Sequence, residues 1–471
     1  MVIAALGVGQ RPRIGTWLAF WTAVTTSSTS IDAALASEPA AREAARPPDS
    51  AALEVEPHRW RRRASSLALG GFVVVCLACF VLSLRVPLAN RNGGGGNLHA
   101  VQARAFLAGR LDIDVPGFYD SCAYRGRTYV PFPPMPAVLM MPIVAAIGIE
   151  RTHGTMIALA LTLLNVAVGY RLARRLGLSP TARVWWLVAM LFGTGYWAAV
   201  CGSTGVWFYA QVVAFTALLL AVAEAWGKGR GLWVGLALAA AFLSRQLTLF
   251  AGFALAARLW SHPRFIDRRA RWLNLARFGA AAGLGVAVYL AFNYARFGNP
   301  FETGYRYIEL DGMLKERFAR HGLFSAAYIP FNLIYLLVQG VHVDFTSPAK
   351  LAGVTPDLYG ASLLGASPYV VVATFARRAG APIRALWLSV AATAAVHLLY
   401  LNNGASQVNT QRFTLDFIPV LFVLVAIGLR READRDRARL WQGAIAYAVV
   451  VNALVHAVFP ALDGAFHALE R

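Results

Sequence analysis

Residues 206–225 read VWFYAQVVAFTALLLAVAEA and are followed by WGKGR at 226–230. An apolar run of about 20 residues is long enough for an α-helix to cross the hydrocarbon core of a bilayer. The run is apolar on all sides, whereas a strand of a membrane β-barrel alternates in polarity from one residue to the next. It therefore predicts a transmembrane helix that ends at a basic turn with Lys228 and Arg230.

Similar runs recur from residue 67 to residue 460 of the 471-residue chain, which is 58% hydrophobic and only 14% charged. Lipid offers no partner to backbone polar groups, so repeated spans of this kind must be helices. The sequence predicts an all-α polytopic membrane protein with about eleven spans. We expect them at 67–89, 154–170, 184–200, 206–225, a pair within 231–260, 273–294, 362–375, 385–401, 413–429 and 441–459.

The formal net charge is +20, and all but three of the basic residues are arginines. The arginines gather in short loops between apolar runs, which is the pattern of cytoplasmic loops and argues against nucleic acid as a partner. Four of them, at positions 59, 61, 62 and 63, precede the first span and predict a cytoplasmic N-terminus. The expected location is the inner (plasma) membrane.

Two regions follow from this pattern. Residues 1–64 are expected to be a disordered cytoplasmic leader, although a weak apolar patch at 14–24 also resembles a signal peptide. Residues 65–471 form the expected transmembrane domain, with outer loops at 90–153 and 295–361.

Some apolar segments are too short or too polar to be simple spans. Residues 137–149 contain Pro142 and predict a re-entrant helix, and 325–341 predict an interfacial one. The spacing of apolar residues from Leu98 to Ala108 predicts a short amphipathic helix on the outer surface. Within 231–260, a turn at Arg245 would place that side chain at the outer tip of a helical hairpin instead of at mid-membrane, where it is costly.

The first outer loop contains the most polar stretch, LDIDVPGFYDSCAYRGRTYVPFPPMP at 111–136. It supplies three carboxylates, Asp112, Asp114 and Asp120. The sequence also allows a disulfide between Cys122 and Cys201, if both face outward. The chain has no nucleotide-binding loop, dinucleotide fingerprint or zinc motif, so no cofactor and no metal are expected.

Six motifs in order resemble the C-type (GT-C) superfamily of polytopic glycosyltransferases, and within it bacterial protein-mannosyltransferase-like proteins. They are GRLD at 109–112, YD at 119–120, GRTYVPFPPMP at 126–136, AFLSRQ at 241–246, NYARFGNP at 293–300 and QRFTLDFIP at 411–419. The resemblance covers roughly residues 65–430. Many members carry an acidic residue just after the first span, whereas residues 90–97 here have none.

The resemblance implies transfer of a sugar from a polyprenyl-phosphate donor to an acceptor glycan, lipid or protein on the outer side of the membrane, with membrane lipid as a further partner. A loop carboxylate would be the general base, with Asp120 preferred over Asp112 and Asp114. Arginine suits the departing phosphate because its planar fork binds phosphate oxygens in pairs. The implied substrate-binding residues are Arg245, Arg412, Arg125, Arg127, Tyr124, Tyr129, Gln246 and Asp416.

Each of these assignments has a structural alternative. Asp120 could pair with Arg125 or Arg127, and Asp416 could be the buried partner of Arg245 or a local partner of Arg412. Four aromatic residues could anchor the chain at the membrane interface instead of stacking on a sugar: Tyr124, Tyr129, Trp197 and Trp207. The alternative function is a transporter or lipid-handling protein that has this fold without catalysis.

Overall fold

The computed structural model describes residues 73–85, 88, 97–115, 120–347, 352–356, 360–376, 380–404, 412–432 and 435–455. The leader at 1–64, the arginines at 59–63, the segment 90–96, Tyr119 and Gln411 lie outside the described residues.

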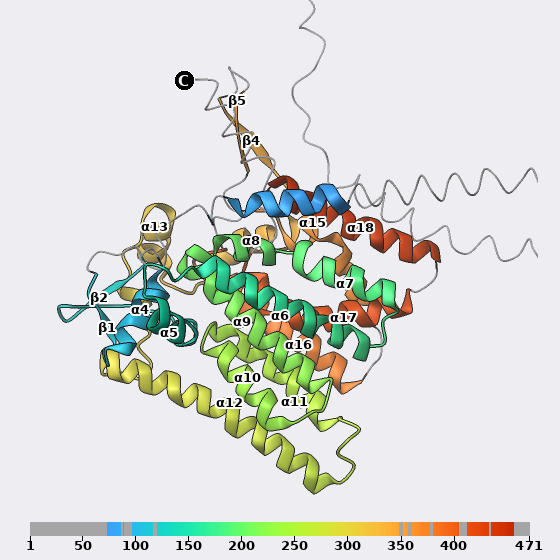
Figure 1. Cartoon of the computed structure of the whole chain (residues 1–471), viewed down its shortest axis with the longest axis horizontal. Helices are drawn as coiled ribbons and strands as arrows, with labels where there is room; N and C mark the ends of the chain where they lie inside the picture. The colour runs from blue at the N-terminus through green and yellow to red at the C-terminus, as the bar shows by residue number, and fades with distance from the viewer. Residues whose placement is uncertain are drawn as a thin grey trace, which may run out of the picture. The chain divides into compact units, whose positions relative to one another are not determined.

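The described chain is predominantly helical, which confirms the predicted fold class (Figure 1). Its α-helices are Val73–Ser83, α4 (Leu98–Leu107), α5 (Met135–Ile147), α6 (Gly154–Arg175), α7 (Pro180–Phe192), α8 (Tyr196–Cys201), α9 (Val206–Ala225), α10 (Gly231–Phe242), α11 (Gly252–Trp260), α12 (Arg268–Phe297), α13 (Gly312–His321), α14 (Ile329–Leu333), α15 (Leu363–Ala366), α16 (Ala381–Leu399), α17 (Ile418–Arg431) and α18 (Arg435–Ala453). Shorter 3-10 helices are η2 (Gly202–Thr204), η3 (Gln246–Ala251), η4 (Tyr305–Tyr307), η5 (Ala326–Tyr328), η8 (Pro368–Phe375) and η9 (Arg412–Asp416), and Ile334–Val338 is a π-helical turn.

Within the described ranges, four helices are long and apolar enough to cross a membrane: α6, α9, α12 and α16. A fifth span results if α7 and the segment Tyr196–Thr204, which meet at a bend of 50°, count as one. These helices make the chain a multi-pass membrane protein. The described residues therefore contain fewer continuous membrane-spanning helices than the roughly eleven that the sequence predicts.

Two expected spans are interrupted where proline or a polar turn breaks the α-helix. The segment expected at 362–375 divides into α15 and the 3-10 helix η8, which begins at Pro368. The segment expected at 413–429 begins as η9, and the α-helix α17 starts only at Ile418, with Pro419 in its first turn. Proline lacks the backbone N–H that a helix interior requires, so Pro368 and Pro419 each stand in the first turn of a new helix.

The core is built around α9 and α17. Most residues of α9 are buried, and α17 is buried from Ile418 to Ala426. The Trp186 indole of α7 donates a hydrogen bond of 2.9 Å to the Phe422 carbonyl of α17. Helices that are apolar on every side can be buried in this way because neighbouring helices surround them.

The predicted hairpin at 231–260 is present as α10, then a break, then η3 and α11. α10 packs between α9 and α12, as Figure 1 shows. Helices α10 and α12 approach closely because each has a glycine at their contact. A Cβ atom on Gly235 would lie 2.4 Å from the Phe278 carbonyl oxygen, and one on Gly285 would lie 2.6 Å from the Ala239 Cβ.

The loop predicted to lie outside forms a small three-stranded antiparallel sheet of β1 (Asp112–Ile113), β3 (Arg127–Tyr129) and β2 (Cys122–Tyr124), in that order. A separate hairpin pairs β4 (Val343–Ser347) with β5 (Ala352–Pro356). The end of α12 packs on the first sheet, where Phe297 meets Tyr124 and Tyr129. The buried Arg296 guanidinium donates to the Val130 carbonyl and, over 2.7 Å, to Asn293 Oδ1. The NYARFGNP motif therefore ties α12 to this loop.

Two expectations for this region are wrong. The helix predicted on the outer surface, α4, is instead mostly buried and packs against α5. The disulfide between Cys122 and Cys201 is not formed, since both are free thiols in separate clusters. Cys122 lies beside Tyr129 and Phe297, whereas Cys201 lies 3.5 Å from Ser83 Oγ.

We expect Gly285→Ala to lower the stability of the protein by roughly 1–3 kcal/mol, because the added methyl forces α10 and α12 apart. The matched control is Gly283→Ala on the same helix, where a Cβ has nothing within 4 Å. The control should leave the thermal unfolding temperature in detergent unchanged or slightly higher. Equal unfolding temperatures for the two variants would show that the helices do not approach as closely as described.

Candidate functional site

A cavity of about 280 Å³ opens at the end of the helices where α9 begins and α16 ends. Seven separate chain segments contribute to it. The lining residues are Trp207, Arg245, Gln246, Leu247, Tyr289, Thr303, Tyr305, Leu323, Phe324, Val396, His397, Tyr400, Phe413 and Asp416. The wall is mainly aromatic and apolar, with a small number of polar groups, which is typical of a ligand site.

Arg245 reaches the cavity because the chain breaks between α10 and η3. Its backbone is extended, with φ −147° and ψ 110°, so the helix does not continue through this residue. Its guanidinium forms two parallel hydrogen bonds to Asp416, from Nε to Oδ1 at 3.0 Å and from Nη2 to Oδ2 at 2.8 Å. The two side chains are only 13% and 1% exposed. Asp416 therefore partners Arg245 and not Arg412.

Asp416 is also approached by His397 from the last turn of α16. His397 Nε2 lies 3.3 Å from Asp416 Oδ2, and its ring stacks on Phe413 with centroids 4.9 Å apart and planes 15° apart. The guanidinium of Arg245 also contacts the Phe413 ring, at 5.3 Å from the ring centroid. One aromatic ring thus fixes the two groups that hold the carboxylate.

Arg412 is buried, at 5% exposure, but has no carboxylate within ion-pair distance in the described part of the chain. Its Nε also lacks a hydrogen-bond acceptor there. Aromatic rings surround the guanidinium, with Phe208 at 5.0 Å and Trp207 and Phe413 each at 5.6 Å. Rings of this kind attract a cation but do not replace a counter-ion. The arrangement leaves one positive charge available to an anionic ligand.

Asp120 is the loop carboxylate that is connected to the cavity. Its Oδ2 accepts a hydrogen bond of 2.6 Å from the Trp207 indole, which lines the cavity. Burial raises the pKa of Asp120, while the Trp207 hydrogen bond and the charge of Arg412 oppose that rise. Its backbone has φ 68°, in the left-handed region that aspartate tolerates better than most residues. The partner of Asp120 is Trp207, not Arg125 or Arg127.

The other two loop carboxylates lie away from the cavity. Asp114 is exposed and pairs with Arg110, and Asp112 lies 3.8 Å from Arg127 and 3.9 Å from Arg110. These pairs belong to the edge of the small sheet. None of the three loop carboxylates lines the cavity itself, but Asp120 is hydrogen-bonded to the lining residue Trp207, whereas Asp112 and Asp114 pair with arginines of the loop.

The remaining predicted residues are also divided between the cavity and the small sheet. Gln246 lines the cavity and donates a hydrogen bond of 2.9 Å to the Tyr289 hydroxyl. Tyr124, Tyr129 and Arg125 belong to the sheet instead. The Tyr124 hydroxyl donates to the Phe297 carbonyl at 3.1 Å, Tyr129 is 7% exposed, and exposed Arg125 lies over the Tyr124 ring.

Several residues that line the cavity are not indicated by any of the sequence motifs. The sequence allows Trp207 to be an interfacial anchor, and in the structure its indole joins Asp120 to the cavity. Tyr129 and Trp197 are buried, so they are not interfacial anchors either. His397 is a lone histidine near the end of an apolar helix, a pattern that could have marked it. Tyr289, Tyr305 and Tyr400 are placed by tertiary packing alone. Among the described residues, no group of three potential ligands could hold a metal ion.

No family model matches the chain, and no curated protein matches it. Solved structures do. The crystal structure of ArnT from Cupriavidus metallidurans bound to undecaprenyl phosphate is 13% identical, with 83% of this chain and 76% of that chain covered and a TM-score of 0.44. The Archaeoglobus fulgidus oligosaccharyltransferase in the apo form is also 13% identical, with 83% and 55% covered and a TM-score of 0.37. Similarity at this level does not assign an activity.

We expect Asp416→Ala to destabilise the protein by roughly 3–5 kcal/mol, because it leaves the Arg245 charge buried without its partner. The double variant Arg245→Met/Asp416→Leu should recover most of that loss, since it removes both charges and keeps the volume. Thermal unfolding in detergent measures both, with Asp114→Ala as the exposed control that should leave the unfolding temperature unchanged. Equal destabilisation by the single and double variants would contradict this account of the pair.

Proposed function

We propose that the protein is a membrane glycosyltransferase that moves a sugar from a polyprenyl-phosphate donor to an acceptor at this cavity. The observation that carries the proposal is the buried guanidinium of Arg412. It has no carboxylate within ion-pair distance among the described residues, and it lies over the ring of Trp207, the hydrogen-bond partner of Asp120. A buried charge is costly unless it is paired. An anionic ligand with an apolar body would pair it and fill the aromatic cavity.

Phosphate is the anion that best matches these groups. A guanidinium offers a planar set of N–H donors that fits phosphate oxygens, and its effect on a departing phosphate is largest where water is excluded. Arg245 is less free to act in this way, because Asp416 already occupies two of its donors. We therefore assign Arg412 to the phosphate and Arg245, with Asp416, to the shape of the site.

In the proposed reaction, Asp120 takes the proton of an acceptor hydroxyl, whose oxygen then attacks the anomeric carbon of the sugar. A bond forms between that carbon and the acceptor oxygen while the bond to the phosphate oxygen breaks. The polyprenyl phosphate leaves with the bonding electrons, next to Arg412. A general base must lie within hydrogen-bond reach of the hydroxyl, and a carboxylate with a raised pKa is better matched to this task than an ordinary one.

The orientation is part of the proposal. If the arginine clusters at the opposite ends of the helices are cytoplasmic, this cavity faces the outer side of the inner membrane. A lipid-linked donor would then enter from the outer leaflet, and the acceptor would be a glycan, lipid or protein outside the cell.

We expect Asp120→Asn to lower the transfer rate by about 100-fold or more, since the amide cannot accept the proton. The assay incubates purified protein in detergent with labelled polyprenyl-phosphate sugars and a panel of acceptors. Asp112→Asn is the matched control, and it should retain transfer because its carboxylate lies beside Arg110 and Arg127 and not beside a residue of the cavity.

Binding of undecaprenyl phosphate, measured in parallel, distinguishes a glycosyltransferase from a transporter or lipid-handling protein. An enzyme should keep binding in Asp120→Asn and lose it in Arg412→Gln. Binding without transfer by the unmodified protein, across all donors and acceptors, would instead support a transporter or lipid-handling protein.

The pH dependence offers an independent check on Asp120. The base must be ionised, so transfer falls as the pH drops through the pKa of Asp120. The Trp207 hydrogen bond favours the ionised form and lowers this pKa. Trp207→Phe should therefore raise the pKa and move the acid limb of the rate profile to higher pH. Trp197→Phe, whose indole hydrogen-bonds to Ser83, is the control and should leave the limb in place. Identical limbs for the two variants would exclude Asp120 as the titrating base.

A further inference from the structure

A second cavity, of about 470 Å³, lies at the other ends of α6 and α9 and at the start of α10. It shares no lining residue with the site described above. Its lining separates into two kinds of surface. Charged side chains come from the helix ends, and apolar side chains come from the turns that follow toward the middle of the same helices.

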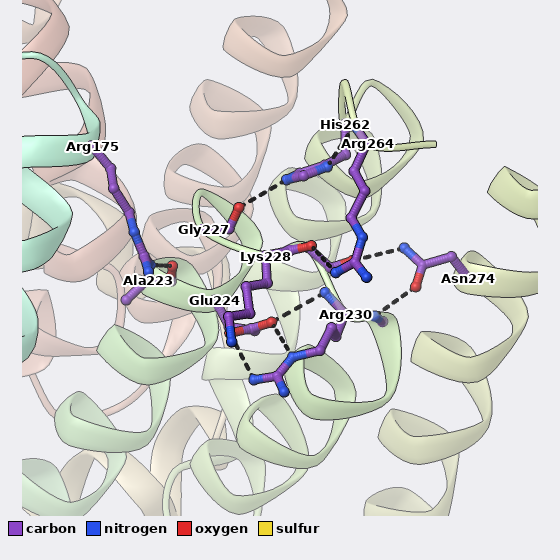
Figure 2. A network of polar contacts seen from close by, with 11 residues as sticks. Arg175, Ala223, Glu224, Gly227, Lys228, Arg230, His262, Arg264 and Asn274 are labelled. Carbon is purple, nitrogen blue, oxygen red and sulfur yellow. Dashed lines mark hydrogen bonds and ion pairs between the residues drawn. The ribbon is translucent and has the colours of Figure 1, made fainter. Parts of the chain in front are cut away.

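The charged rim has an excess of positive charge. Glu224 is paired with Arg230, whose Nε lies 2.8 Å from Glu224 Oε1 (Figure 2). Arg175 donates a hydrogen bond of 2.6 Å to the Ala223 carbonyl, which holds its guanidinium against the end of α9. Arg171 is exposed and has no carboxylate within ion-pair distance in the ranges that the structure covers. Two of the three arginines at the rim are therefore not neutralised by a carboxylate.

The apolar wall lies on the surface that faces away from the protein core. Trp233 is 53% exposed, Leu236 is 38% exposed and Leu220 is 37% exposed. Arg230 lies 5.6 Å from the centre of the Trp233 ring. Tryptophan with a flanking arginine is typical of the level at which lipid head groups meet the hydrocarbon. The wall is thus continuous with the lipid-facing side of α9 and α10.

We propose that this cavity binds an anionic glycerophospholipid from the leaflet at the basic ends of the helices. The phosphate contacts Arg171 and Arg175 at the rim, and an acyl chain follows Leu220, Trp233 and Leu236. A soluble phosphate compound would leave the apolar wall exposed, and a zwitterionic lipid would not match the net charge of the rim. Basic pockets between transmembrane helices are suited to anionic lipid head groups.

The test uses the full-length protein in detergent and native mass spectrometry to measure its binding of palmitoyl-oleoyl phosphatidylglycerol and of the corresponding phosphatidylcholine. The unmodified protein should prefer phosphatidylglycerol. Arg171→Gln should weaken phosphatidylglycerol binding about fivefold, the effect of one basic side chain near an anionic head group. Arg174→Gln is the matched control, because Arg174 is an exposed arginine of the same helix end that does not line the cavity.

A second variant keeps the test independent of any one side chain. Trp233→Glu places a negative charge in the wall and should abolish the preference for phosphatidylglycerol. Equal affinity of the unmodified protein for the two lipids, or equal losses in Arg171→Gln and Arg174→Gln, would overturn the proposal. Displacement of the lipid by millimolar inorganic phosphate would also overturn it, because it would mean that the rim alone makes the site.

Discussion

The buried ion pair of Arg245 and Asp416 is the contact on which the site depends. It joins the break after α10 to the turn before α17, and His397 adds the end of α16 to the same carboxylate. Without water, each charge is stabilised only by its partner and the groups around it. Moving either side chain away would therefore cost a large free energy. The breaks in these helices are therefore held in place by electrostatics as well as by packing.

Charge balance around that pair has a direct consequence. Arg245 lines the cavity, the buried Arg412 lies over two of its lining rings, Trp207 and Phe413, and Asp416 binds only Arg245 directly. The charge of Arg412 is left to aromatic rings and to Asp120, whose own carboxylate is partly buried and held by Trp207. Through Trp207, a cation and a base with a raised pKa therefore lie beside one apolar cavity, which is the combination that the proposed transfer uses.

Helix α9 connects the two cavities of this structure. Trp207 in its first turn lines the proposed catalytic cavity, and Glu224 near its last residue lies in the basic one. Its 20 residues span about 30 Å, which is the thickness of the hydrocarbon core. The two cavities thus lie at opposite ends of a helix as long as the hydrocarbon core is thick. Each combines arginine with an apolar wall, but Glu224 of the basic cavity is paired with Arg230, whereas Asp120 beside the first cavity is held by Trp207.

The sequence by itself determined the helical membrane class, the helices α6, α9, α12 and α16, and the break at Arg245. These features follow from hydropathy, length and the cost of a charge in lipid, all of which act locally along the chain. Only the tertiary structure decided which polar residues meet. Asp416 lies 171 residues from Arg245, and Trp207 lies 87 residues from Asp120. Asp112 and Asp114 resemble Asp120 in sequence, yet they pair with Arg110 and Arg127 at the edge of the sheet. A local pattern does not encode burial or pairing between distant segments, because both depend on how the helices pack.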